Sequence, residues 1–273
     1  MAGLQKLQGF SAAGLVLVVD PLLVDRDFLV ETKTRGVSQV IIPLDIAGKQ
    51  LFKHYHRTSG GDLWATYWET LKEAVAVFGG RKVTVNLFAG LGETEEEFLS
   101  VVQMIDDAGA ETNIFSVREN KALGIKPCSI GKYRRLQMGR YLIHRQLATM
   151  RQMQFNEFGS VFEFGIHPNK LMELLELGIP FHETGGSLKN WPGHDNSCGG
   201  TRNYHQPLAA DEAQQAKKEF FSVNWEEEWK LAAKKCQREG VDFRDIDVSY
   251  DFKLLGFIPG ITEEDLRYLK SSK

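Results

Sequence analysis

Cysteine is scarce in this sequence, which has only Cys128, Cys198 and Cys236 in 273 residues and no Cys-x-x-Cys pair. An odd number of widely separated cysteines argues against a disulfide framework and is typical of a reducing compartment. We therefore expect a cytoplasmic protein whose fold depends on its hydrophobic core and not on covalent cross-links.

Long apolar runs and long basic runs are also absent. The longest apolar run, GLVLVVDPLLV from Gly14, is interrupted by Asp20 and Pro21 and is too short to span a bilayer. No basic segment with a signal-peptide cleavage site precedes it. The net charge is −3, and no basic tract offers a phosphate-binding surface. We expect neither a membrane nor nucleic acid among the partners.

What the sequence does contain is an ordinary globular composition, 42% hydrophobic and 25% charged, in a chain long enough to bury a large core. In the first half, short apolar strands alternate with amphipathic helices, which is the pattern of parallel βα units. The predicted strands are 15–19, 37–44, 83–89 and one from about 112, and the predicted helices include 25–35, 63–79, 94–109 and 130–156. The pattern predicts an α/β fold with a partial TIM-type (βα) barrel or an open parallel sheet.

The second half differs in character, and we divide the chain into a partial barrel over 1–155 and an α-rich C-terminal extension over 156–273. Residues 155–167 predict one more strand, and helices are expected over 169–177, after Asp211, and from an Asn224 cap to a stop at Gly240. A further strand is predicted over 252–258, followed by a terminal helix from Thr262. The loop 180–207 is rich in Gly, His and Asn, and loops of this length are usually functional or mobile.

The carboxyl ends of parallel strands are the usual place for a ligand, so residues that follow each predicted strand are site candidates. Asp20 and Asp45 follow two of them, and each is either a ligand contact or a turn cap. The segment VTVNLFAGLGETEEEFLSVV, from residue 83, is an apolar strand ending at two glycines, with Thr94 and Glu97 forming a capping box for the next helix. Its turn either admits a ligand close to the backbone or is simply a tight, capped connection.

Three segments resemble the later part of the radical S-adenosylmethionine (SAM) core, of the type shared by biotin synthase and lipoyl synthase. LFAGLGETEEEF resembles the fifth-strand motif Gly-x-Ile-x-Gly-x-x-Glu, with Phe88, Gly90 and Glu93 at its last three defined positions and Asn86 at the first. IIPLDIAG is similar to the fourth strand, and IFSVRENKALGIKPCSIGKYRRLQMGRYLI is similar to the sixth strand with the helix after it. The resemblance covers residues 11–145.

The resemblance implies that this chain binds S-adenosylmethionine at the ends of its strands. It assigns a polar contact to Asp45, adenine packing to Phe88 and close backbone approach to Gly90. It assigns turn capping to Glu93, and pairing with a carboxylate or a phosphate to Arg118. In this family, cleavage of the cofactor yields a 5′-deoxyadenosyl radical that abstracts hydrogen from a small-molecule or protein-bound substrate. Sulfur insertion, a transferase reaction, is the family-level expectation. No residue is identified as catalytic.

The family holds a [4Fe-4S] cluster with a Cys-x-x-x-Cys-x-x-Cys loop after its first strand, and this chain has no such loop. By the resemblance, the chain begins near the third strand, which leaves the apolar strand 15–19 with an unpaired edge. A partner chain carrying the missing strands and the cluster, in a heterodimer, is therefore expected. Pairing of two copies in a homodimer is the alternative.

The polar loop adds four residues of metal-binding or substrate-binding type, namely His182, His194, Cys198 and His205. Their spacing matches no standard zinc site, and CGGTRNYHQP only loosely resembles a paired-cysteine stretch of lipoyl synthase relatives, with one cysteine missing. Metal binding, substrate or partner contact, and a merely ordered loop stay open. For the whole chain, the alternatives to a radical SAM component are a non-catalytic half-barrel partner or regulatory subunit, and a βα-barrel enzyme that binds a phosphorylated ligand.

Overall fold

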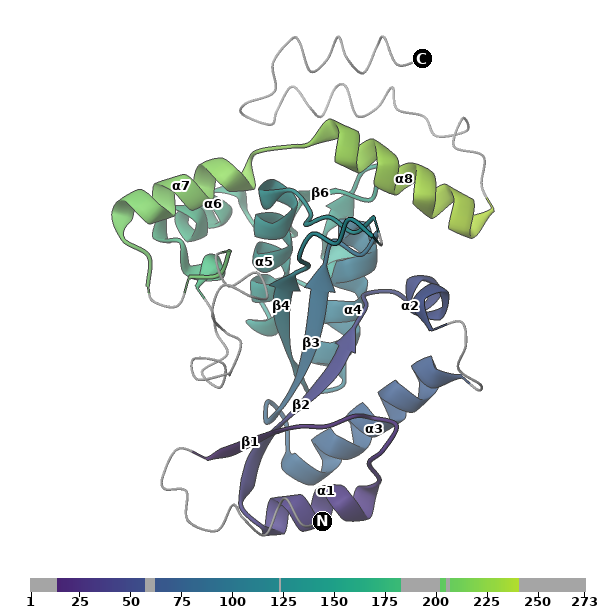
Figure 1. Ribbon diagram of the computed structural model, residues 1–273. Helices are drawn as coiled ribbons and strands as arrows, with labels where there is room; N and C mark the ends of the chain where they lie inside the picture. Colours follow the sequence, from purple (N-terminus) through teal and green to yellow (C-terminus); the bar gives the residue numbers. More distant parts are fainter. Residues whose placement is uncertain (1–13, 57–61, 123, 183–201, 205–206, 241–273) are drawn as a thin grey trace, which may run out of the picture.

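The computed structural model describes residues 14–56, 62–122, 124–182, 202–204 and 207–240, which form an α/β fold (Figure 1). One parallel sheet has its strands in chain order, β1 (Leu15–Val18), β2 (Val37–Asp45), β3 (Val83–Ala89) and β4 (Glu111–Ser116). Because each strand lies beside its predecessor, all four carboxyl ends meet at one edge of the sheet. The predicted α/β class is confirmed, and this order is compatible with an arc of a (βα) barrel.

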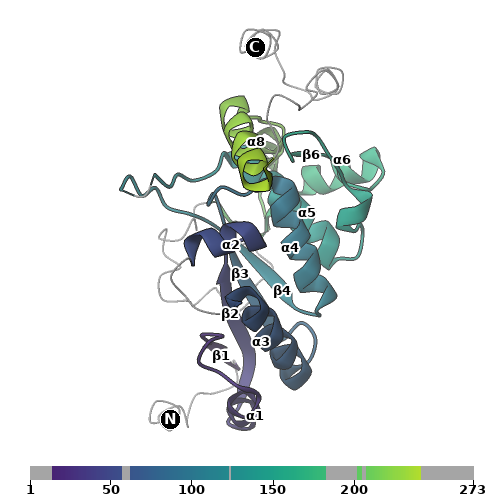
Figure 2. The same ribbon diagram turned by 90° about the vertical axis from the view of Figure 1, so that its right-hand side faces the viewer.

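Helices cover one face of the sheet (Figure 2). The helices between the strands are α1 (Arg26–Thr34), α2 (Lys49–Tyr55), α3 (Leu63–Phe78) and α4 (Glu95–Asp107). Those after the sheet are α5 (Ile130–His144), α6 (Pro168–Leu177), α7 (Ala210–Phe220) and α8 (Trp225–Glu239), with the short 3-10 helices η2 (Met150–Gln152) and η3 (Ile179–Phe181). The helix starts at Thr94 and Asn224 and the stop at Gly240 are as predicted.

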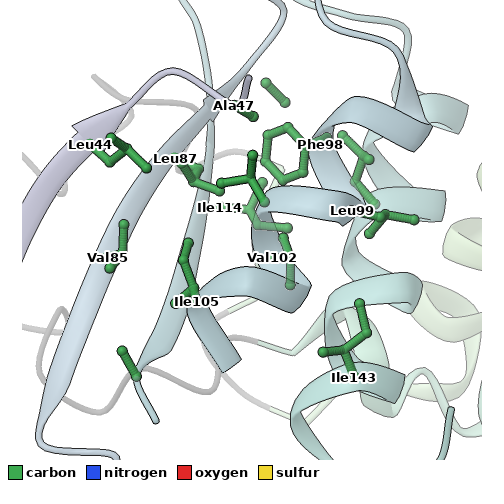
Figure 3. Packing of buried hydrophobic residues seen from close by; sticks show 14 of the residues in the cluster. Leu44, Ala47, Val85, Leu87, Phe98, Leu99, Val102, Ile105, Ile114 and Ile143 are labelled. Carbon is green, nitrogen blue, oxygen red and sulfur yellow. The ribbon is translucent and has the colours of Figure 1, made fainter. Parts of the chain in front are cut away.

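Alternation along β3 shows how the two faces of the sheet are used. Val83, Val85, Leu87 and Ala89 are buried, whereas the side chains between them are half-buried on the opposite face. The buried set packs against Phe98, Leu99, Val102 and Ile105 of α4 and Ile143 of α5 (Figure 3). Removal of this apolar surface from water provides the main stabilisation of the parallel sheet and its helices.

Two predicted elements differ from the structure. The helix predicted over 130–156 ends at His144, because Gln146 adopts a left-handed conformation (φ 56°) and the Leu147 N–H bonds back to the Leu142 carbonyl. The strand predicted over 155–167 does not extend the parallel sheet. It is a small antiparallel pair, β5 (Gln154–Phe155) and β6 (Val161–Glu163).

The helices after residue 156 pack directly on the parallel sheet and its helices. Ion pairs join Lys235 to Glu96 (2.6 Å) and Arg238 to Glu97 (2.7 Å), so α8 is held against the start of α4. The hydrophobic core is continuous from the sheet into α6 and α7. The predicted strand 252–258 and the helix from Thr262 lie outside the described residues. Among the described helices, none is both long enough and apolar enough to cross a membrane.

Candidate functional site

A cavity of about 470 Å³ lies where β3 and β4 end. Phe88, near the end of β3, and Arg118, just after β4, both line it. The rest of the wall includes Leu91, Ser116, Val117 and Ile125. The Phe88 ring lies beside that of Phe115, with centroids 5.4 Å apart and planes inclined by 33°. Two of the five predicted cofactor residues thus come together at the predicted edge of the sheet.

Arg118 is exposed and makes no hydrogen bond or ion pair with any described residue. Its guanidinium group is therefore available to a ligand, and such a group pairs in a bidentate manner with a carboxylate or a phosphate. The nearby Tyr55 hydroxyl donates to the Leu91 carbonyl (3.0 Å), which ties α2 to the turn beside the cavity.

Glu93 is fully buried beneath the turn and caps it, as predicted. Its two carboxylate oxygens accept the N–H groups of Gly90 (2.8 Å) and Leu91 (2.9 Å). The Lys132 ammonium lies 3.4 Å from the same carboxylate and donates to the Glu93 carbonyl. Because this carboxylate already occupies the position in which a phosphate would bind the two amides, a phosphorylated ligand at this turn would have to displace a buried ion pair.

Gly90 has a positive φ of 111°, and the chain itself fills the space beside it. A Cβ atom here would lie 2.8 Å from the Val117 side chain, 2.9 Å from the Cys128 nitrogen and 3.0 Å from the Lys126 oxygen. The loop between β4 and α5 packs so closely on residue 90 that only glycine fits there. We predicted that a ligand would lie close to the backbone of Gly90. On this side of Gly90, the protein's own backbone takes that place.

Asp45 ends β2 and lies outside the Phe88 cavity. It is a non-glycine residue with φ 62°, and no described residue donates a hydrogen bond to its carboxylate. Burial raises the pKa of Asp45 to about 6. The pKa of Tyr67, on α3, is raised by burial and by the charges of Asp20 and Asp45.

Asp45 yields a prediction about pH and stability. Its pKa is higher in the folded state than in the unfolded chain, so its stabilising contribution is present below pH 3.8 and is lost as the pH rises through about 6. We expect Asp45→Asn, which tolerates the same backbone conformation, to raise the free energy of unfolding at pH 8 by about 2 kcal/mol and to change little at pH 3.5. Urea unfolding across this pH range measures the difference.

The exposed Glu157 provides the matched control, because its neutralisation removes a carboxylate that the fold does not desolvate. Glu157→Gln should change the free energy of unfolding by less than about 0.5 kcal/mol at either pH. A destabilising effect of Asp45→Asn at pH 8 would show that the Asp45 carboxylate has a stabilising partner. It would contradict the expectation that the ionised, buried carboxylate lowers the stability of the fold.

The residues that the structure describes do not fit a [4Fe-4S] cluster. Iron–sulfur clusters are held by thiolates, and burial raises the pKa of the Cys128 thiol to about 12. Cys236 is also buried, and no three His, Cys, Asp or Glu side chains of the described residues are grouped as metal ligands. His182 lies just after η3, with a buried ring nitrogen that has no hydrogen-bond partner among the described residues. His194, Cys198 and His205 are outside the described residues.

Sequence patterns missed the buried cations of α5 that support this end of the sheet. Lys132, Arg134, Arg135 and Arg140 are all buried, and each bonds to carboxylates or carbonyl groups of other elements. The sequence contains one sign of these buried cations. The segment IGKYRRLQMGRYLIH has cations around the whole helix and no single apolar stripe, which is unlike an ordinary surface helix.

Comparisons with models of protein families, with curated proteins and with solved structures find no match. The function is therefore inferred from the geometry of the site and from the residues that form it. That geometry consists of an aromatic pair, a guanidinium group with no partner among the described residues, and a desolvated carboxylate at one edge of a parallel sheet.

Proposed function

We propose that this chain is one component of a radical SAM enzyme of the biotin synthase and lipoyl synthase-like type. It binds the adenosyl part of S-adenosylmethionine at the carboxyl ends of its strands, and a partner chain supplies the [4Fe-4S] cluster. The observation that carries the proposal is that Phe88, near the end of β3, and Arg118, just after β4, line one cavity there.

Each group in the cavity has a role in this scheme. An aromatic ring binds a purine by stacking, and the paired rings of Phe88 and Phe115 offer such a surface. Arg118 pairs with the carboxylate of the methionine part. Glu93 and Lys132 hold the turn in place from below, and Asp45 supplies a polar contact from the next strand. The cofactor supplies the 5′-deoxyadenosyl group, and the substrate is a small molecule or a protein-bound group, with sulfur insertion as the reaction class.

The exposed edge of the sheet at β1 is the reason for proposing a partner chain. β1 is apolar, and within the described residues it pairs only with β2. Next to it, Leu22 and Leu23 are 47% and 81% exposed. An apolar edge strand with exposed leucines favours pairing with another chain. Strands supplied by a partner would continue the arc of the barrel, and a second copy of this chain is the alternative occupant.

The adenosyl-binding role predicts a loss of affinity when the stacking surface is removed. We expect Phe88→Ala to weaken binding of S-adenosylmethionine to the full-length chain by about tenfold, because aromatic stacking of a base contributes roughly 1–3 kcal/mol. Isothermal titration calorimetry measures the affinity. Phe155→Ala, which truncates a half-buried phenylalanine of β5 outside the cavity, is the control and should bind as the parent chain does. Equal affinity of Phe88→Ala and the parent chain would refute the assignment.

Anaerobic isolation of the protein from its native cells distinguishes the split enzyme from a non-catalytic subunit. Co-purification of a chain with a Cys-x-x-x-Cys-x-x-Cys loop, together with iron and release of 5′-deoxyadenosine, supports the split enzyme. S-adenosylmethionine binding without iron, such a partner or cleavage activity indicates a binding or regulatory subunit. A chain that binds no S-adenosylmethionine would exclude both.

A further inference from the structure

A second and larger cavity, of about 610 Å³, lies away from the ends of the parallel strands. It is formed by β6 and the segment after it, by α6, and by the connection from α7 to α8, and it shares no lining residue with the Phe88 cavity. Most of its wall is apolar, and aromatic side chains include Phe162, Phe164, Phe221 and Trp225. Its volume lies within the range of pockets that take small organic ligands.

Two charged groups at the wall of this cavity, Arg135 and Glu228, are already paired, and the third, Glu163, is a carboxylate that accepts a hydrogen bond from Gln154. The Arg135 guanidinium donates to the carboxylates of Glu95 and Glu228 and to the carbonyl groups of Phe220 and Ser222. Ser160 donates its hydroxyl to Glu228. One cation thus faces two carboxylates and has no donor left over. An anionic ligand would find no partner here and would meet excess negative charge, which favours an uncharged ligand.

Asn156 supplies one hydrogen-bond donor that no described residue uses. Its side-chain oxygen accepts the N–H groups of Phe158 (3.1 Å) and Ser160 (2.9 Å), which fixes the orientation of the amide. No described residue accepts a hydrogen bond from its NH₂ group, and Asn156 lines the cavity. This NH₂ group can donate to a carbonyl or hydroxyl oxygen of a ligand.

We propose that this cavity is a binding site for an uncharged small molecule with an aromatic or branched apolar body and one carbonyl or hydroxyl oxygen, which Asn156 binds. The apolar wall buries the body of the ligand, and the saturated Arg135 cluster excludes carboxylates and phosphates. This site is independent of the adenosyl-binding function, because the two cavities have no residue in common.

Two naphthalene probes test the preference for an uncharged ligand. The neutral ketone 6-propionyl-2-(dimethylamino)naphthalene should bind the full-length chain saturably, with a blue shift of its emission. The anionic 8-anilinonaphthalene-1-sulfonate should bind at least tenfold more weakly. This comparison needs no variant and so does not depend on the folding of one. Equal affinities for the two probes, or no saturable binding of the ketone, would overturn the proposal.

Variants then locate the probe. Leu171 lines the cavity from α6, and Leu171→Trp should fill part of it and weaken binding of the ketone at least tenfold. Leu177→Trp, on the same helix at a side chain that is 54% exposed, is the matched control and should not change binding. Asn156→Asp keeps the two backbone hydrogen bonds but removes the donor, and should weaken binding several-fold. Thermal melting checks that each variant is folded.

Unchanged ketone binding in a folded Leu171→Trp or Asn156→Asp protein would overturn the proposed site. S-adenosylmethionine affinity, measured on the same samples, keeps the two proposals apart. We expect it to be unchanged in Leu171→Trp, because that side chain does not line the Phe88 cavity. A variant that loses the ketone but retains S-adenosylmethionine therefore supports this site, whatever the outcome for the enzyme.

Discussion

Replacement of Arg135 by methionine is expected to lower the free energy of unfolding by about 3–5 kcal/mol at pH 8, because it leaves buried carboxylates without their cation. Arg135 lies 2.7 Å from Glu95 and 3.0 Å from Glu228, and both carboxylates are buried. It also donates to the Ser222 carbonyl (2.9 Å), which joins α5 to the connection between α7 and α8. Loss of this one side chain should therefore loosen the α7–α8 connection from α5.

The pH dependence of this loss identifies its cause. Burial, reinforced by the charge of Glu228, raises the pKa of Glu95 to about 7, and Arg135 opposes that rise. Without Arg135, the pKa of Glu95 rises further, so the folded variant takes up a proton more readily than the unfolded chain does. The destabilisation should therefore be smallest near pH 5 and largest near pH 8. Urea unfolding at several pH values, followed by circular dichroism, measures it.

Arg35 provides the control, because it is an exposed arginine that pairs with Glu31 on the same helix. Arg35→Met should cost less than about 1 kcal/mol and show no comparable dependence on pH. A similarly small cost for Arg135→Met, or one that does not vary between pH 5 and 8, would contradict the account of the buried cluster.

Lys132→Met is expected to cost about 3–5 kcal/mol, by removing the cation from a fully buried pair. The Lys132 ammonium lies 3.4 Å from the Glu93 carboxylate, and both side chains are almost completely inaccessible to solvent. Because Glu93 also caps the amides of Gly90 and Leu91, the variant should disturb the turn beside the Phe88 cavity. We expect weaker S-adenosylmethionine binding in addition to the loss of stability.

A double-mutant cycle with Glu93→Gln measures the interaction itself. If the two side chains act as a pair, the double variant should be more stable than the sum of the single losses predicts, by about 1–3 kcal/mol. Lys170→Met, which removes an exposed partner of Glu173, should change the free energy of unfolding by less than about 0.5 kcal/mol. Additive effects at Lys132 and Glu93 would mean that the ammonium group acts only through the Glu93 carbonyl.

Local signals made the α/β class and the strands of the parallel sheet predictable from the sequence. The Thr94 and Glu97 capping box and the Gly240 stop depend on residues a few positions apart, and the structure has both as predicted. The alternation in 83–89 likewise identifies a strand with one buried face. The end of α5 was mispredicted, because no glycine or proline marks it and Gln146 adopts the left-handed conformation without a local sequence signal.

The candidate site was only partly predictable, because only some of its features depend on residues that are close in the sequence. Position at a strand end is a local property, so the sequence alone placed Asp45, Phe88 and Arg118 at one edge of a parallel sheet. Which of them share a cavity, and which polar groups are already paired, depends on contacts between distant segments. Lys132 lies 39 positions from Glu93, and Glu228 lies 93 positions from Arg135. Only the tertiary structure brings these charges together, because burial decides whether a charge must have a partner.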